Sequence, residues 1–152
     1  MKNRGFEKIA AYRDVDLLMP QRKTVHSAGY DIVAAEDVDL LPGQVTLVPT
    51  GLKAYMNNDE YLGIHIRSGL AIKYCLSLIN SQGIIDADYY NNPDNEGHIM
   101  IAVYNHGTVK LSIVRNCRIA QGIFYKFLRV DNDISVETTK RQGGMGSTGE
   151  YK

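Results

Sequence analysis

The fold class is decided by stretches such as Tyr61-Leu62-Gly63-Ile64-His65-Ile66, a short aromatic and aliphatic run that begins just after the polar residues 57–59. Short apolar runs closed by Gly, Pro, Asn or Asp are typical of β-strands joined by turns. Six further runs have this form: Tyr30–Ala34, Val45–Pro49, Leu52–Met56, His98–Tyr104, Lys110–Val114 and Ile119–Phe127. So many short strands indicate an all-β sandwich, barrel or jelly roll.

Turn chemistry and helical spacing add detail to this prediction. Pro42-Gly43 follows the run Val38–Leu41, and Asn57-Asn58-Asp59 closes another run. Because Pro fixes φ while Gly and Asn tolerate left-handed φ, we expect the strands on either side of each turn to pair as hairpins. Only Ser68–Tyr74 has helical spacing, and Ser68 is its expected N-cap.

Length, composition and charge limit what the chain can be. Its 152 residues suit one domain, and 44% hydrophobic with 22% charged residues is ordinary for a folded globular protein. Seventeen basic residues balance seventeen acidic ones, so we expect no nucleic-acid partner and no membrane partner. Any phosphate must then be held by local groups. Residues 1–10 lack the apolar core of a signal peptide, which predicts a cytoplasmic location.

Several common site types are excluded by motif. Cys75 and Cys117 lie far apart and outside any Cys-x-x-Cys pattern, so we expect reduced, packed thiols and no zinc site. Neither Gly-x-x-x-x-Gly-Lys-Ser/Thr nor Gly-x-Gly-x-x-Gly follows a strand, which excludes nucleotide binding by a P-loop or a Rossmann fold.

Arg67-Ser68-Gly69 is the first candidate for phosphate chemistry, because a strand is expected to run into the short helix there. The unpaired N–H groups of a first helical turn favour an anion, and a guanidinium and a hydroxyl lie beside them. A helix cap and a solvated charge explain the same tripeptide equally well.

Two further stretches combine polar groups with strand-like runs. Gly83-Ile84-Ile85-Asp86-Ala87-Asp88-Tyr89-Tyr90 ends in two carboxylates, and a carboxylate at a pocket edge can activate water. Turn chemistry accounts for one of these aspartates. In Arg118-Ile119-Ala120-Gln121-Gly122, strand alternation places Gln121 on the face opposite Arg118, where its amide needs hydrogen-bond partners. A purely structural glutamine is the competing interpretation.

The last residues, 143–152, concentrate glycines and hydroxyl groups just after Lys140-Arg141. Such a backbone can wrap an anion. A free tail also explains this composition.

Five segments, in their order and spacing along the chain, resemble the motifs of the trimeric dUTP diphosphatase family. They are Ser27–Asp31, Arg67–Ala71, Gly83–Tyr89, Arg118–Gln121 and Gly143–Gly149. The resemblance implies a jelly-roll-like distorted β-barrel with one short helix over residues 1–142. It also implies that residues 143–152 form a flexible glycine-rich arm that closes over the active site, rather than a free tail.

The same resemblance implies an activity and an assembly. Members hydrolyse dUTP to dUMP and pyrophosphate, which limits uracil incorporation into DNA and supplies dUMP for thymidylate synthesis. A homotrimer with active sites at its subunit interfaces is implied, each site built from more than one chain. The implied cofactor is Mg²⁺, held mainly by the triphosphate.

Individual roles are carried over by motif position. Asp86 resembles the general base for the water that attacks the α-phosphorus, and Gln121 the second catalytic position, which holds the phosphates. Tyr89 resembles the ring under the deoxyribose, and Asp31 the carboxylate that meets the metal through water. The other implied substrate-binding residues are Arg67, Ser68, Gly69, Asn80, Gly83, Ile85, Arg141, Met145, Gly146, Ser147 and Thr148. Asn80 and the backbone of residues 83–85 would read uracil.

The chain departs from the family pattern at three places. Met145 replaces the aromatic lid of the fifth motif, which predicts a looser contact with uracil. Either Lys140 or Arg141 is the basic residue before that motif, and we favour Arg141 for its bidentate fork. Tyr90 replaces a glycine and precedes an insertion, Asn91–Glu96, so the hairpin of the third motif should be longer.

Two rival functions stay open at this point. A dCTP deaminase shares the implied fold and resembles Glu96–Ala102, but it needs a catalytic glutamate where Ala102 stands, and alanine cannot transfer a proton. A non-catalytic trimer that senses dUTP is disfavoured because every catalytic-type position is present. The insertion could still serve a regulatory role.

Overall fold

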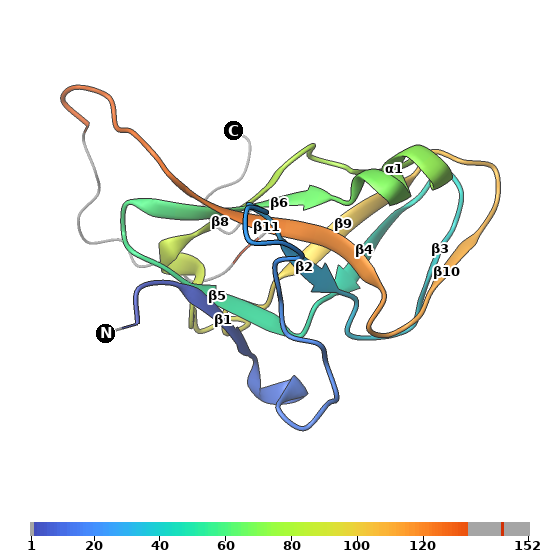
Figure 1. Cartoon of the computed structure of the whole chain (residues 1–152), viewed down its shortest axis with the longest axis horizontal. Coiled ribbons are helices and arrows are strands. Elements are labelled where there is room, and N and C mark those ends of the chain that lie inside the picture. The colour runs from blue at the N-terminus through green and yellow to red at the C-terminus, as the bar shows by residue number, and fades with distance from the viewer. Residues whose placement is uncertain (1, 134–143, 145–152) are drawn as a thin grey trace.

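Strands dominate the computed structural model, which describes residues 2–133 and residue 144 (Figure 1). The strands are β1 (Gly5–Lys8), β2 (Tyr30–Val33), β3 (Val38–Leu40), β4 (Val45–Pro49), β5 (Leu52–Tyr55), β6 (Glu60–Ile66), β7 (Leu76–Leu78), β8 (Gly83–Asp86), β9 (Met100–Asn105), β10 (Leu111–Ile113) and β11 (Arg118–Lys126). The helical elements are α1 (Ser68–Tyr74) and the short 3-10 turns η1 (Ala10–Tyr12) and η2 (Ala87–Tyr89). The predicted all-β class with one short helix is therefore confirmed. No helix in the described part is long and apolar enough to cross a membrane.

The strands form a jelly-roll-like arrangement of small antiparallel sheets. The largest has the order β2-β11-β6-β8, and a second has the order β4-β9-β7. Two strand pairs, β1-β5 and β10-β3, complete the structure at opposite sides of the molecule (Figure 1). Apolar side chains from both larger sheets meet in one buried cluster that includes Ile32, Leu62, Ile64, Ile101 and Val103.

The hairpins expected across the two turns are wrong. Pro42-Gly43 and residues 57–59 do lie in turns, but the strands beside them pair elsewhere. β3 pairs with β10 while β4 pairs with β9, and β5 pairs with β1 while β6 pairs with β11 and β8. Turn residues fix a local reversal, whereas packing between sheets chooses the partners, and in a jelly roll consecutive strands cross between sheets.

The helix α1 has the predicted bounds but not the predicted cap. Arg67 is the N-cap residue, without a side-chain cap hydrogen bond, so the expectation of Ser68 as N-cap is wrong. The helix stops at Cys75, which has a left-handed φ of 54°. Cys75 and Cys117 are both free, and Cys75 is exposed, so the expectation of a packed thiol is wrong for Cys75.

The four-stranded sheet has one face on the core and one facing away from it, which we call the outer face. Strand register aligns Asp31, Gln121 and His65 across β2, β11 and β6 on this face. Further along the sheet, Tyr61 of β6 lies between Tyr125 of β11 and Asp86 of β8. The outer face therefore carries polar residues at both ends of β6.

Candidate functional site

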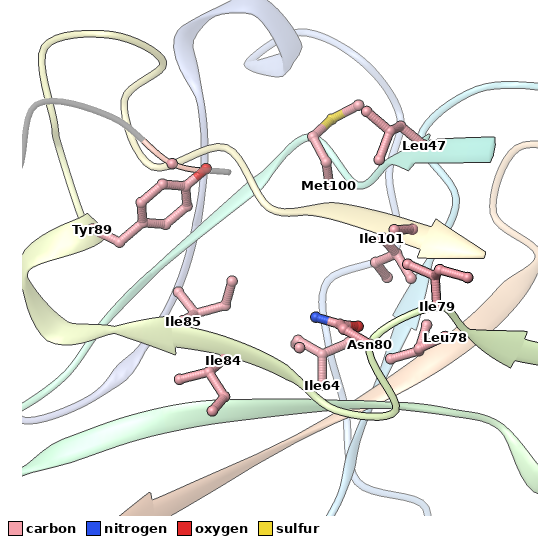
Figure 2. Close-up of a pocket in the computed structure, with 13 residues that line it drawn as sticks. Leu47, Ile64, Leu78, Ile79, Asn80, Ile84, Ile85, Tyr89, Met100 and Ile101 are labelled. Carbon is pink, nitrogen blue, oxygen red and sulfur yellow. The ribbon is translucent and has the colours of Figure 1, made fainter. Parts of the chain in front are cut away.

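A pocket of about 330 Å³ lies beside the turn between β7 and β8, and we call it the β7–β8 pocket (Figure 2). Four of the residues expected to bind substrate line it: Asn80, Gly83, Ile85 and Tyr89. The rest of the lining is mostly apolar and includes side chains of β4, β6 and β9 (Figure 2). One apolar pocket with a few converging polar groups is the usual form of a small-molecule site.

Strand β8 gives this pocket a hydrogen-bonding edge. It pairs with β6 on one side, and no described strand is hydrogen-bonded to Gly83–Ile85 on the other. The backbone N–H and C=O groups of that edge can therefore serve a ligand. The turn before β8 is tight, because Gln82 N donates to Asn80 O at 2.7 Å and Ser81 has a left-handed φ of 64°. This turn aims the Asn80 side chain into the pocket (Figure 2).

Tyr89 closes one end of the pocket from the 3-10 turn η2. The residue is only 7% exposed. Its hydroxyl donates to the carbonyl of His98 at 2.9 Å and accepts from Nδ2 of Asn95 at 2.8 Å. Gly144 also lines the pocket, and a Cβ there would lie 2.7 Å from Cε2 of Tyr89. The chain therefore approaches the ring at Gly144 more closely than any side chain would allow.

Asp86, the expected general base, does not line the β7–β8 pocket. It is the last residue of β8, where it pairs with Tyr61 on the outer face. It lines a separate depression together with Glu60, Asp88 and other residues of that corner. Strand alternation explains this placement, because Gly83 and Ile85 face the core side of the sheet while Asp86 faces away.

A second group of expected site residues gathers around Asp31, and we call it the Asp31 cluster. The Asp31 carboxylate lies 3.5 Å from Nε of Arg67 and 3.7 Å from Nε of Arg118, and its side chain is 16% exposed. Gln121 lies directly opposite Asp31 in the β2–β11 pairing. Two guanidinium groups, an amide and a carboxylate therefore converge at one end of the outer face. The guanidinium and amide groups can bind an anion, and the carboxylate can bind a cation that accompanies the anion.

One oxygen of this cluster suits a hydrated metal ion. Asp31 Oδ2 is buried and lies 3.7 Å from Nε of Arg118, but it accepts no hydrogen bond from any residue in the described part of the chain. A buried acceptor normally has a partner. Mg²⁺ keeps several waters when it binds, and those waters are donors. The cluster therefore fits a magnesium ion held through water rather than through a set of protein ligands.

A β-bulge corrects the expected facing of Arg118. The β2–β11 register shifts between Arg118 and Ala120, so Ile119 and Ala120 are both buried. The extra residue reverses the alternation and moves Arg118 to the face of Asp31 and Gln121. Arg118 was not among the residues expected to bind substrate. Its position in the fourth motif, Arg118–Gln121, was the sequence signal that could have identified it.

Three further residues lie near the Asp31 cluster: Ser68 and Gly69 are exposed, whereas Gly29 packs tightly against a side chain. Ser68 and Gly69 begin α1, are exposed, and leave empty space where a Cβ of Gly69 would point. Gly29 is different, because a Cβ there would collide with Oε1 of Gln121. Glycine at position 29 therefore leaves room for the Gln121 amide.

The two groups of site residues lie far apart within one chain. Asp86 pairs with Tyr61 near the start of β6, and Arg67 directly follows its end. The six residue-to-residue steps from Tyr61 to Arg67 span roughly 20 Å of extended strand. Arg141, Met145, Gly146, Ser147 and Thr148 fall outside the described residues. One chain thus brings together only part of the predicted site.

Comparison with known proteins places this geometry in a family. A family model described as dUTPase matches residues 16–149. The deoxyuridine 5'-triphosphate nucleotidohydrolase of Lactococcus lactis subsp. lactis (strain IL1403) is 50% identical over 149 residues, which cover 98% of this chain and 99% of that protein.

Solved structures agree with this match. The crystal structure of dUTPase from Streptococcus mutans has a TM-score of 0.80 and 46% identity, and covers 84% of this chain and 99% of that one. A mutant dUTPase from phage phi11 of S. aureus, described with a structural Mg(II) ion, shares the fold with a TM-score of 0.71 and 19% identity, over 92% of this chain and 100% of that one. The chain belongs to the dUTPase family.

Proposed function

We propose that this dUTPase-family protein hydrolyses dUTP to dUMP and pyrophosphate at sites shared between the subunits of a homotrimer. The observation that carries the proposal is the β7–β8 pocket, where Asn80, Tyr89 and Gly83–Ile85, on the edge of β8 that pairs with no described strand, surround one apolar space. A nucleobase is flat and apolar on its faces and polar on its edge. This pocket offers matching groups.

Uracil would be read by the backbone edge of Gly83–Ile85 and by Asn80. Backbone groups are rigid, so a cytosine would leave buried donors or acceptors unpaired, and this mismatch lowers its affinity. The ring of Tyr89 would lie under the deoxyribose and leave no room for a 2′-hydroxyl. Ala102 lines the same pocket and has no group that can transfer a proton, which favours hydrolysis over deamination.

The triphosphate would be held by the Asp31 cluster of a neighbouring subunit. Arg67, Arg118 and Gln121 would contact phosphate oxygens, with Ser68 and the amide of Gly69 at the open first turn of α1. Mg²⁺, when bound with the triphosphate, supplies charge neutralisation at its oxygens. Asp31 would hold that ion through water.

Asp86 would act as the general base that deprotonates the attacking water. A base and a phosphate ligand must each reach atoms of one substrate at hydrogen-bond distance, about 3 Å. The roughly 20 Å along β6 between Asp86 and Arg67 is too far for this within one chain. A second copy can supply the missing half of the site, because head-to-tail contacts between identical subunits can close into a ring. In such a ring, one part of each subunit faces a different part of its neighbour.

The outer face supports such an assembly. Tyr61 and Tyr125 stack there with ring centroids 5.1 Å apart, and Ile84 is 58% exposed. Apolar side chains between two polar ends are suited to burial against other subunits.

We further propose that residues 143–152 close over the substrate, with Arg141, Ser147 and Thr148 at the phosphates and Met145 and Gly146 at the base. The exposed free thiol of Cys75 fits a cytoplasmic location.

The proposal is tested by the products formed from dUTP. The wild-type protein with Mg²⁺ should release dUMP and pyrophosphate, and dCTP should not be converted to dUTP. Asp86→Asn should lower kcat by roughly 10²- to 10⁴-fold, as loss of a general base does, while the KM for dUTP changes little. Turnover within a few-fold of wild type would remove Asp86 from the role of base.

A further inference from the structure

We propose that Asn95, within the insertion Asn91–Glu96, is a positioning residue that sets the selectivity for deoxyribose by holding the Tyr89 hydroxyl. This inference rests on the proposed function, since it concerns the ring under the sugar. Tyr89 Oη accepts from Nδ2 of Asn95 at 2.8 Å and donates to the carbonyl of His98 at 2.9 Å. The far end of the ring is therefore fixed by two hydrogen bonds.

Asn95 is itself held in place by the insertion. Its Oδ1 accepts from the backbone N of Gly97 at 3.0 Å and from Nδ2 of Asn92 at 2.8 Å. Asn92 is 5% exposed, and its Nδ2 also donates to the carbonyl of Tyr89 at 2.8 Å. The backbone end and the hydroxyl end of Tyr89 are thus connected through the same two asparagines.

The insertion is also anchored to the body of the protein. Nζ of Lys53, a buried residue of β5, donates to Oδ1 of Asn91 at 2.6 Å and to Oε1 of Glu96 at 3.3 Å. Glu96 Oε2 accepts from the backbone N of Ala10 at 2.8 Å. The first and last residues of the insertion are therefore tied to two other segments, so the loop can act as a rigid support.

Rejection of a ribose requires such a support. An apolar surface alone discriminates weakly against a substrate that merely adds a hydroxyl, because the surface can yield. A ring whose hydroxyl is hydrogen-bonded on two sides cannot move away from the sugar without breaking those bonds. We therefore assign to Asn95 an effect on the ratio of kcat/KM for dUTP to kcat/KM for UTP.

The experiment measures pyrophosphate release from dUTP and from UTP in wild type, Asn95→Ala, Tyr89→Phe and the double variant. Loss of one neutral hydrogen bond predicts that Asn95→Ala lowers the dUTP/UTP selectivity roughly three- to tenfold, mainly through a lower KM for UTP. Tyr89→Phe keeps the ring but lacks the hydroxyl, so it should lower selectivity in the same direction. In the Tyr89→Phe background, Asn95→Ala should have little further effect.

The matched control is Asp94→Ala in the same loop. Asp94 takes part in the hydrogen bonds described here only through its backbone N, which donates to Oδ1 of Asn92. It should keep the wild-type selectivity. Unchanged selectivity in both Asn95→Ala and Tyr89→Phe would overturn the role of Asn95. An Asn95→Ala effect of equal size in the wild-type and Tyr89→Phe backgrounds would overturn it as well. Failure of the proposed function is distinct, because the wild type would then not hydrolyse dUTP in the same assay.

Discussion

Two inactive variants should restore activity to each other if each site takes Asp86 and Arg67 from different chains. Asp86→Asn removes the base, and Arg67→Ala removes a phosphate ligand roughly 20 Å away along β6. The two variants are co-expressed with different tags, and trimers that contain both are purified through both tags. In a cyclic trimer of either mixed composition, one interface pairs an intact Asp86 with an intact Arg67, so about one third of the sites should be active.

The assay compares pyrophosphate release by the mixed trimers with release by each variant alone. Mixed trimers should reach about one third of the wild-type kcat per subunit. A matched control combines Arg67→Ala with Gln121→Ala, which both alter the Asp31 cluster and should leave no intact site. Mixed trimers of Asp86→Asn and Arg67→Ala that are no more active than their parents would refute the shared site.

Further perturbations test single contacts. Tyr89→Ala should raise kcat/KM for UTP relative to dUTP, and selectivity equal to wild type would remove the sugar gate. Gly29→Ala should lower kcat, because its Cβ collides with Oε1 of Gln121; an unchanged kcat would show that the observed position of this amide is not needed. Arg4 lowers the pKa of Glu60 to about 2, so this pair stabilises the fold above pH of about 4.5 and loses its effect as the pH falls towards 2. Glu60→Gln should lower the free energy of unfolding, measured in urea, by about 1.5–3 kcal/mol at pH 7 and by less at pH 3. An equal loss at both pH values would contradict the stabilisation by the Arg4–Glu60 pair.

Local sequence signals predicted the elements well and their partners poorly. The bounds of β4 and α1 match the expected runs, because apolar periodicity and turn residues are properties of a few neighbouring positions. The N-terminal strand β1 was not expected, since Gly5–Lys8 alternates charged and apolar residues and becomes a strand by pairing with β5. The hairpin error has the same origin, because packing between distant segments chooses the strand pairs.

The site followed the same division. The third motif identified Gly83 and Tyr89, the family resemblance added Asn80, and the structure brings these three residues into one pocket. The separation of Asp86 from the Asp31 cluster depends on the register of β8 against β6, which no local pattern reveals. Likewise the bulge that turns Arg118 towards Asp31, and the hydrogen bond from Asn95 to Tyr89, depend on backbone geometry.

A crystal structure with magnesium and a non-hydrolysable imido analogue of dUTP would test the shared site most directly. We expect uracil against the backbone edge of Gly83–Ile85, an Asp86 oxygen about 3 Å from a water in line with the α-phosphorus, and Arg67 of another copy at the phosphates. A nucleotide bound outside the β7–β8 pocket, or with Asp86 remote from the α-phosphorus, would contradict the proposed mechanism.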